Sequence, residues 1–565
     1  MRNKFTVKNF FVLGILLTLL WSLLTFIIIP NLNMLSITMF KNGKFDLTPL
    51  FKVIKSKRVL EALSNSFILG ILVALSTNIL GVFQLLVLDY FKIRGRKWLS
   101  IAYFAPLVCN GMVLVLSYYY LIGPNGYFTK GLQQIIPSLP NEWMIGFKAV
   151  FFQLTVSNTI FHITFVRDAL RGIDFQTIEA AKNLGGSTWS ILRKVVLPTL
   201  TPSILAATIL NFLMAVGAFA SPKILGGSMF QTINPLVLSF TKSRTTQNYG
   251  VILSVFLGLV TLLVLILFNY LQNRVNVVSV SKVKTKLVRQ DIENRYVRII
   301  MTLLAHLVAI IQIIPMLAVI LFSFIPYKSL MSGNLFLQGL TLENWQNVMH
   351  SSGLKPLVVS FLYSVIAAIV SVIIVIFVAR LITKYKNVFT KLLELIMLVP
   401  WFLPATLISL GLLLSFNTPI ILIANQILTG TLVILLIGYI ILRLPTNLRI
   451  IKAAYASIDS SLEDAAKNLG ASEFKAFYKV ILPLILPVSI STTLLSFTGL
   501  FAEFDMSVFL FHPLFAPLGI IINNATDPEA TPSAVMLSFV YAVIIMLVFT
   551  IATYFVYGRK SPNNL

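Results

Sequence analysis

Charged residues are scarce in this chain of 565 residues: Asp, Glu, Lys and Arg together make up 11% of it. Soluble domains carry about a quarter. Hydrophobic residues account for 57% of the sequence, and its mean hydropathy is +0.90. This composition excludes an ordinary soluble domain and predicts a protein that lies in a lipid bilayer.

Residues and motifs for several kinds of chemistry are also missing. With Cys109 as its one cysteine, the chain cannot form an internal disulfide. The four histidines are far apart and lack metal-ligand spacing, so we expect no metal site. Neither Gly-x-x-x-x-Gly-Lys-Ser/Thr nor His-Glu-x-x-His occurs. A bound nucleotide or other cofactor is therefore not expected, and a membrane-embedded enzyme is disfavoured.

Long apolar runs are abundant instead. A membrane-spanning helix needs about 20 mostly apolar residues, and the sequence has about twelve such runs. The predicted spans are approximately 10–30, 62–88, 99–121, 145–166, 200–220, 249–271, 299–325, 358–382, 391–416, 418–442, 485–511 and 533–557. We read the first run as a retained helix, because it is longer than a signal core and no small-x-small cleavage site follows it. The expected fold class is an all-α polytopic membrane protein with about 12 transmembrane helices.

The net charge of +25 comes from basic residues that are unevenly placed along the chain. If the N-terminus lies in the cytoplasm, most basic loops also fall on the cytoplasmic side, as the positive-inside rule requires. We therefore predict a multi-pass protein of the cell membrane with a cytoplasmic N-terminus and no nucleic-acid partner. The basic segment 41–58 is the exception, because this topology places it outside.

One polar segment occurs twice. "EAAKNLGGSTWSILRKVVLPTLTP" begins at Glu179, and "DAAKNLGASEFKAFYKVILPLILP" begins 285 residues later, at Asp464. The first twenty residues of the two copies share eleven identities. Each half has an even number of predicted spans, so the halves are parallel repeats and both segments face one compartment. The predicted domains are 1–273 and 299–565, joined by a charged cytoplasmic linker at 274–298.

Each repeated segment predicts two short helices separated by a break. Good helix formers lead to Gly185 in the first copy, where glycine permits a helix to stop. Ser187 and its counterpart Ser472 are suited to N-cap the next helix, and Pro198 and Pro483 to start the following span. Such a hook either covers lipid headgroups as an interfacial helix or docks another protein. Its duplication with matched small residues favours docking to a symmetric partner.

This pattern resembles the "EAA" cytoplasmic loop of permease subunits of type I ABC importers. Here the loops are 179–202 and 464–487, and the family fold is two six-helix repeats about a pseudo-two-fold axis. The second copy has Asp in place of the family's Glu, with Glu463 just before it. By this resemblance, the residues that dock an ATPase are Glu179, Ala180, Ala181, Gly185, Pro198, Asp464, Ala465, Ala466, Gly470 and Pro483.

The resemblance also implies partners and a class of cargo. ATP and magnesium would be bound by a separate homodimeric ATPase at the cytoplasmic face, and the solute would arrive on an extracytoplasmic binding protein. Two permease domains fused in one chain resemble the ferric-iron and thiamine importers. Polyamine, sulfate and phosphonate systems are more distant relatives. A membrane receptor or scaffold that uses the same hooks without transport is the alternative from another functional class.

Ionisable residues in membrane spans often mark a transport pathway. Glu503 and Asp505 fall in or near the span predicted at 485–511, and no base lies close to them in the sequence. They favour a cationic substrate, unless both simply face water at the end of the span. Further pathway candidates are Asn158, Asn211 and His162, for which hydrogen bonding between helices is the competing role.

Overall fold

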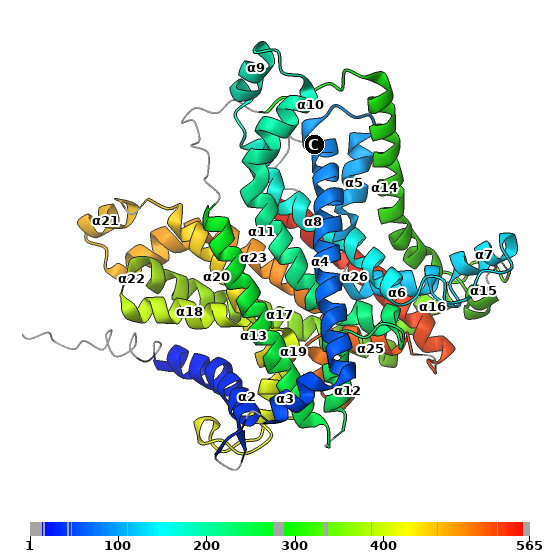
Figure 1. Cartoon of the computed structure of the whole chain (residues 1–565). Coiled ribbons are helices and arrows are strands. Elements are labelled where there is room, and N and C mark those ends of the chain that lie inside the picture. Colours follow the sequence, from blue (N-terminus) through cyan, green and yellow to red (C-terminus); the bar gives the residue numbers. More distant parts are fainter. Residues whose placement is uncertain are drawn as a thin grey trace, which may run out of the picture.

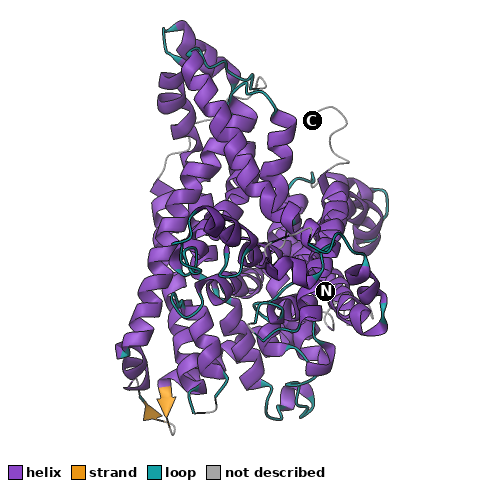
Figure 2. Cartoon of the chain, turned by 90° about the vertical axis from the view of Figure 1, so that its right-hand side faces the viewer, coloured by secondary structure: helices purple, strands orange, loops and turns teal. Residues whose placement is uncertain are grey.

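The computed structural model describes residues 14, 17–41, 44–46, 48–109, 111–243, 245–274, 287–332, 334, 337–385, 387–459, 461–527 and 529–557. Residues 275–286 of the predicted linker and the basic residues at both chain ends lie outside these ranges. In the described part the chain is almost entirely helical, and Figure 2 shows a single two-stranded hairpin at one end.

The first half contains six regions of long helix. They comprise α2 (Ile29–Met39), α4 (Lys57–Leu85), the pair α5 (Arg96–Val108) and α6 (Gly111–Ile122), α8 (Phe147–Arg171), α11 (Leu197–Val216) and α13 (Gln247–Arg274). Shorter elements join them: β1 (Phe40–Lys41), β2 (Lys44–Phe45), α3 (Thr48–Lys55), α7 (Tyr127–Ile135), α9 (Phe175–Asn183), α10 (Thr188–Ile191) and α12 (Ile233–Thr241).

The second half repeats this order. Its long helices are α14 (Arg295–Phe322), α17 (Ser351–Lys384), the pair α18 (Val388–Phe402) and α19 (Ala405–Ser415), α20 (Leu432–Ala456), α23 (Leu482–Phe501) and α26 (Pro532–Tyr557). The short ones are α15 (Tyr327–Ser332), α16 (Glu343–Met349), α21 (Ser461–Asn468), α22 (Glu473–Ala476), α24 (Ser507–Leu510) and α25 (Leu518–Asn524). In each half the second long helix packs on the fourth-span and fifth-span helices, as α4 does on α8 and α11, and α17 on α20 and α23.

The described residues include ten helices that are long and apolar enough to cross a membrane, or up to twelve if each of two bent pairs counts as one span. The bent pairs are α5 with α6, at 106°, and α18 with α19, at 105°. The sequence predicted one span in each of these regions, 99–121 and 391–416, and did not predict the bends. In the second pair, Leu403 is extended before Pro404, because proline disfavours a helical residue in front of it.

Two other predicted spans are also corrected. The run 418–442 is not one helix, since α20 begins at Leu432 and the residues before it form a loop with a short 3-10 turn. The apolar residues of 418–431 favour a helix, but Pro419 and Gly430 are typical of turns and interrupt it. In the run 485–511 the long helix α23 ends at Phe501, after which the chain turns and forms the short helix α24.

The two halves exchange their first long helices. In the second half, α14 packs on α5 and α6 of the first half. The Tyr103 hydroxyl donates to the Ala305 carbonyl oxygen at 2.9 Å, and the Ser117 hydroxyl donates to that of Pro315 at 2.6 Å. In return α2 packs on α19, where the Asn33 amide donates to the Ser415 hydroxyl at 2.9 Å. The first long helix of each half therefore packs against the helices of the other half.

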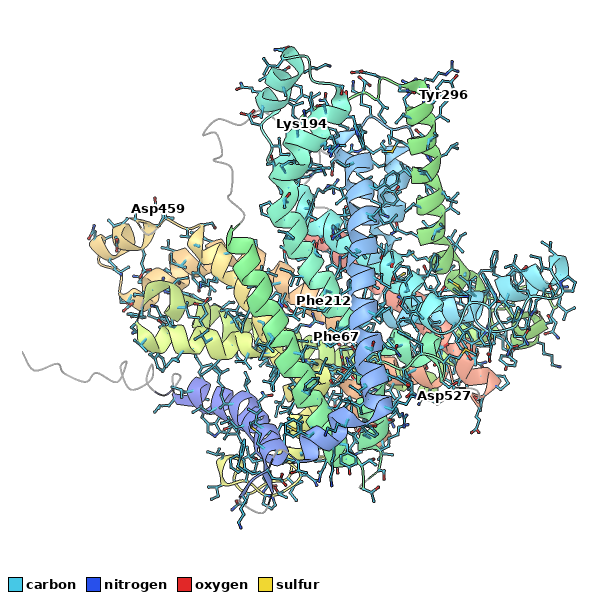
Figure 3. The ribbon with its side chains drawn as sticks, in the orientation of Figure 1. Phe67, Lys194, Phe212, Tyr296, Asp459 and Asp527 are labelled. Carbon is cyan, nitrogen blue, oxygen red and sulfur yellow. The ribbon has the colours of Figure 1, made fainter. Side chains whose placement is uncertain are left out.

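The repeated segments lie at two separate corners of the molecule. In Figure 1, α9 is at the top and α21 is at the left, while α3, α12 and α25 lie below and to the right. The labelled side chains of Figure 3 follow the same arrangement, with Lys194 and Asp459 near the two segments and Asp527 on the opposite side. The basic segment around α3 therefore lies far from both repeated segments.

Candidate functional site

The first repeated segment folds as a helix, a stop and a second helix. We name residues 174–198 hook 1. The Asp174 carboxylate caps α9 by accepting from the Gln176 amide, and the helix ends at Gly185, whose φ is +82°. The Gly185 amide donates to the Lys182 carbonyl and the Gly186 amide to that of Ala181, which is the Schellman pattern of a helix end. Ser187 then caps α10.

Hook 2, residues 459–483, reproduces this geometry 285 residues later. Gly470 also has a φ of +82°, and its amide donates to Lys467 while the next amide donates to Ala466. Ser472 caps α22 as Ser187 caps α10. The helix stop and the second cap are therefore the same in both copies, so the sequence fixes the two hooks locally.

The outermost residues of both hooks are apolar and face away from the protein. Leu184 and Leu469 occupy equivalent positions, and each side chain is 89% exposed. The aromatic residues Trp189 and Phe474, also equivalent, are 69% and 64% exposed. A pair of matched apolar surfaces of this kind is typical of protein docking sites. The sequence analysis missed these four residues, although the identity of the leucines at the repeat offset was a usable signal.

The ATPase-docking residues expected from the family pattern lie on these hooks. Glu179, Ala180 and Gly185 are exposed, as are their counterparts in hook 2, while Ala181 and its counterpart are half-buried. The prolines lie further back, in the first turns of α11 and α23. Each set thus has an accessible portion beside an exposed leucine.

Hook 1 is attached to the body of the protein by apolar packing and by the end of the linker. Ile178 and Ile191 are buried in one cluster with Ile292. The adjacent linker residue Gln290 forms a parallel bridge with Phe91, and the Thr188 hydroxyl donates to Glu293 at 3.3 Å. Because residues 290–293 at the end of the linker contact hook 1 and the helix end beside it, they help to hold this hook in place.

Hook 2 is attached by ion pairs as well as by apolar packing, in which Ile481 is buried. Glu463, at the position of Ile178, pairs with Arg380 at 2.5 Å, Lys467 at 3.1 Å and Lys384 at 3.4 Å. A cavity of about 800 Å³, lined by these four residues among others, lies beside the hook.

Glu463 remains ionised over the physiological pH range. Burial alone would raise its pKa, but hydrogen bonds from Arg380 and Lys467, with the charges of Arg380 and Lys384, lower it to about 2. A lowered pKa in the folded state means that the ion pairs stabilise hook 2 at full strength above pH 4.5 and lose that effect as the pH falls toward 2.

The helix stop of hook 2 yields a local prediction. Replacing Gly470 by Val forces a β-branched residue into a left-handed conformation at a cost of about 1–2 kcal/mol. We expect amide hydrogen exchange in 461–471 to become about tenfold faster, as measured by mass spectrometry, while hook 1 is unchanged. Gly131→Val is the control, because Gly131 has no positive φ and nothing lies within 4 Å of an added Cβ. Equal exchange in the variant and wild type would contradict the assigned stop.

The structure uses Glu503 to cap a short helix. Its carboxylate accepts from the Met506 amide at 2.8 Å, from the Ser507 amide at 3.1 Å and from the Ser507 hydroxyl at 3.0 Å. The Arg443 guanidinium from α20 also acts on its charge. Glu503 therefore lies beyond the end of α23 with its oxygens already occupied.

Asp505 lies half-buried in the same turn, and no hydrogen bond or ion pair to it is found among the described residues. Phe504 lies between the two acids in the sequence. The Lys223 ammonium of the other half lies 5.4 Å from the centroid of its ring. The fold thus brings one base, Arg443, to Glu503, although no base lies near this acid in the sequence. Charge at this turn does not by itself select a cationic substrate.

The remaining pathway candidates lie between helices of the first half. His162 and Asn211 are fully buried, and the Asn211 amide nitrogen lies 3.2 Å from His162 Nδ1. On the other side of the ring, His162 Nε2 lies 2.6 Å from Asn78 Oδ1. The same positions in the second half hold a bonded polar pair, Ser496 and Asn447, 2.7 Å apart. This repetition favours a helix-bridging role for both candidates. For the buried Asn158 amide nitrogen, no hydrogen-bond partner is found among the described residues.

The sequence profile of a transporter family matches both halves of the chain. The family is described as "Binding-protein-dependent transport system inner membrane component", and the match covers residues 5–277 and 371–560. The chain belongs to this family. Because the profile matches twice, two permease domains are fused in one multi-pass membrane protein.

Individual relatives of this permease agree with the family. It is 34% identical to "Probable ABC transporter permease protein y4fN" of Sinorhizobium fredii (strain NBRC 101917 / NGR234), over 98% of this chain and 97% of the relative. It is 22% identical to "Ferric transport system permease protein FbpB" of Actinobacillus pleuropneumoniae, over 98% and 80%. It is also 22% identical to "Spermidine/putrescine transport system permease protein PotC" of Escherichia coli (strain K12), over 37% and 72%. The permease is therefore an ABC importer subunit, with relatives that differ in cargo.

Proposed function

We propose that this permease moves a small solute from an extracytoplasmic binding protein into the cytoplasm, driven by a separate homodimeric ATPase that binds both hooks. The observation that carries this proposal is the pair of matched hooks, each of which exposes a leucine, Leu184 or Leu469, by 89%. Two equivalent hooks fit a partner that has two equivalent binding clefts, and a homodimer has such a pair. ATP and magnesium would be held by that partner and not by this chain.

The basic residues near the hooks also indicate how the chain is oriented in the membrane. We propose that the hooks and the N-terminus lie in the cytoplasm and that the chain resides in the cell membrane. The positive residues near the hooks support this side, because cytoplasmic loops carry an excess of Lys and Arg. Alternating access then follows: as the ATPase closes, it draws the hooks together, and the two halves open at the opposite end.

Ferric iron is the cargo we propose first. Its support is the ferric permease relative, which aligns over 98% of this chain as a fused permease. Thiamine, a polyamine, a phosphonate or sulfate are the alternatives, and the polyamine permease relative aligns over 37% of the chain. Pathway contacts are proposed for Asp505 and Asn158 ahead of Glu503, Asn211 and His162, because the described residues offer no hydrogen-bond partner to the Asp505 carboxylate or the Asn158 amide nitrogen.

The test is ATP hydrolysis by the permease in nanodiscs with the ATPase and binding protein encoded beside its gene. We expect hydrolysis to rise several-fold when the binding protein carries ferric iron, and not with thiamine, spermidine, phosphonate or sulfate. Stimulation by another member of this panel would replace the cargo and keep the importer. Failure of the ATPase to bind would contradict docking through the hooks. ATPase binding without stimulation or uptake would favour a receptor or scaffold.

A further inference from the structure

The two halves meet through equivalent residues at the end of the bundle opposite the hooks. Phe219 follows α11, and Phe504 follows α23 at the repeat offset of 285. Their ring centroids are 5.4 Å apart, and both side chains are buried. Two residues related by a two-fold axis touch only where they lie at that axis. This aromatic contact therefore closes the space between the halves, and we name it the seam.

Lys223 crosses the seam from the first half. Its ammonium donates to the Asn523 side-chain oxygen at 2.8 Å, on α25 of the second half. It also lies 5.4 Å from the centroid of Phe504, within the range of a cation–π contact. Both partners belong to the other half, so these contacts exist only while the seam is closed.

The lysine contact has no copy in the other half of the repeat. The position equivalent to Lys223 is Val508, and the position equivalent to Asn523 is Leu238. The second half thus builds the equivalent turn without a lysine, and the charged residues of that turn are the acids Glu503 and Asp505. A half-buried ammonium in a membrane protein is costly and by default marks a function. The fold itself does not explain why a lysine stands here.

We propose that Lys223 is a latch that keeps the seam closed while the hooks are apart. This inference rests on the proposed transport function. Separation of the halves breaks the bond to Asn523 and the contact with Phe504 together, and the ammonium is then hydrated. The latch therefore sets how often the seam opens before the ATPase draws the hooks together. Cargo would otherwise leak, or ATP would be hydrolysed without cargo.

A labelling experiment tests the latch without any ATPase. Ser221, buried in the same turn, is replaced by Cys in a chain whose Cys109 is replaced by Ala, and reaction with a membrane-impermeant maleimide is followed in nanodiscs. We expect Lys223→Met to raise the rate about tenfold, as a shift toward the open seam would. Loss of the nearby positive charge would by itself slow the thiol, so a faster reaction reports opening.

Three further variants define the latch. Asn523→Leu, which copies Leu238, should raise the rate as much as Lys223→Met, and the double variant should add nothing. Lys223→Arg should keep the wild-type rate, because a guanidinium also donates to Asn523 and stacks on Phe504. Lys52→Met is the matched control, because Lys52 is an exposed lysine in the same half and is not among the charges that act on Lys223. An unchanged rate in either Lys223→Met or Asn523→Leu would overturn the proposal.

ATP hydrolysis separates the latch from the transport proposal. In the reconstituted system, Lys223→Met should raise the rate without binding protein several-fold and lower the stimulation by loaded binding protein. If Lys223→Met keeps wild-type labelling and basal hydrolysis but loses uptake, the lysine contacts the cargo and the latch is rejected. If the wild type shows no stimulation by any cargo, the transport proposal fails, and the labelling result still decides the latch.

Discussion

The double variant Leu184→Asp with Leu469→Asp should lose binding of the ATPase while its own fold is unaffected. Each leucine is 89% exposed in the isolated chain, so it contributes little to folding. Burial of a leucine in a partner's cleft is worth about 1.5–3 kcal/mol, and the two sites together about 3–6 kcal/mol. Binding should therefore weaken at least about a hundredfold. Pull-down or light interferometry against the purified ATPase measures this loss.

The matched control for the leucines is Leu514→Asp. Leu514 is 68% exposed. It lies ten residues after the seam residue Phe504 and outside both hooks. It should bind the ATPase like the wild type. All variants should retain the wild-type melting temperature in detergent. If the double hook variant binds normally, the ATPase does not dock on these leucines.

Asp89→Asn should destabilise the first half strongly. The Asp89 carboxylate is 4% exposed and pairs with Arg167 at 2.5 Å, Arg171 at 3.1 Å and Arg96 at 3.4 Å. Within the described residues none of these arginines pairs with another acid, so the substitution leaves three cations repelling one another. Loss of one partner from a buried pair costs about 3–5 kcal/mol. We expect the lower end, because the arginines reach water, and a melting temperature several degrees lower.

Asp291→Asn is the control for this charge cluster. Asp291 pairs with Lys92 at 2.6 Å, but both side chains are more than half exposed, at 69% and 54%. Exposed pairs contribute about 0–1 kcal/mol because water screens them. The melting temperature should therefore barely change. Equal effects of the two substitutions would show that burial of the Asp89 cluster is not what stabilises it.

The hooks show how far local sequence determines this protein. Gly185 and Gly470 predict the helix stops, Ser187 and Ser472 predict the caps, and the structure places all four as expected. Helix stops and caps depend on contacts within about six residues, so a single sequence contains the needed information. The spans follow from apolar length in the same way, apart from the two bends, the loop before α20 and the early end of α23.

The contacts that attach the hooks to the rest of the protein could not be predicted from the local sequence. Ile178 and Glu463 occupy the same position in the repeat, yet one is buried among apolar residues and the other pairs with three bases. Which partner meets position 463 depends on α17, some eighty residues earlier in the chain. The role of the linker end against hook 1 likewise appears only when residues near 91 and 290 lie side by side.

The sequence by itself determined that the protein lies in a membrane, contains two copies of one domain and presents two equivalent hooks, because these features follow from composition, the internal repeat and local hydrogen bonding. Only the tertiary structure decided that the first helices are exchanged, that Glu503 caps a helix, and that Lys223 meets Phe504 and Asn523. The last contact joins residues 300 positions apart. Such contacts are set by how helices pack, and no local pattern of residues encodes them.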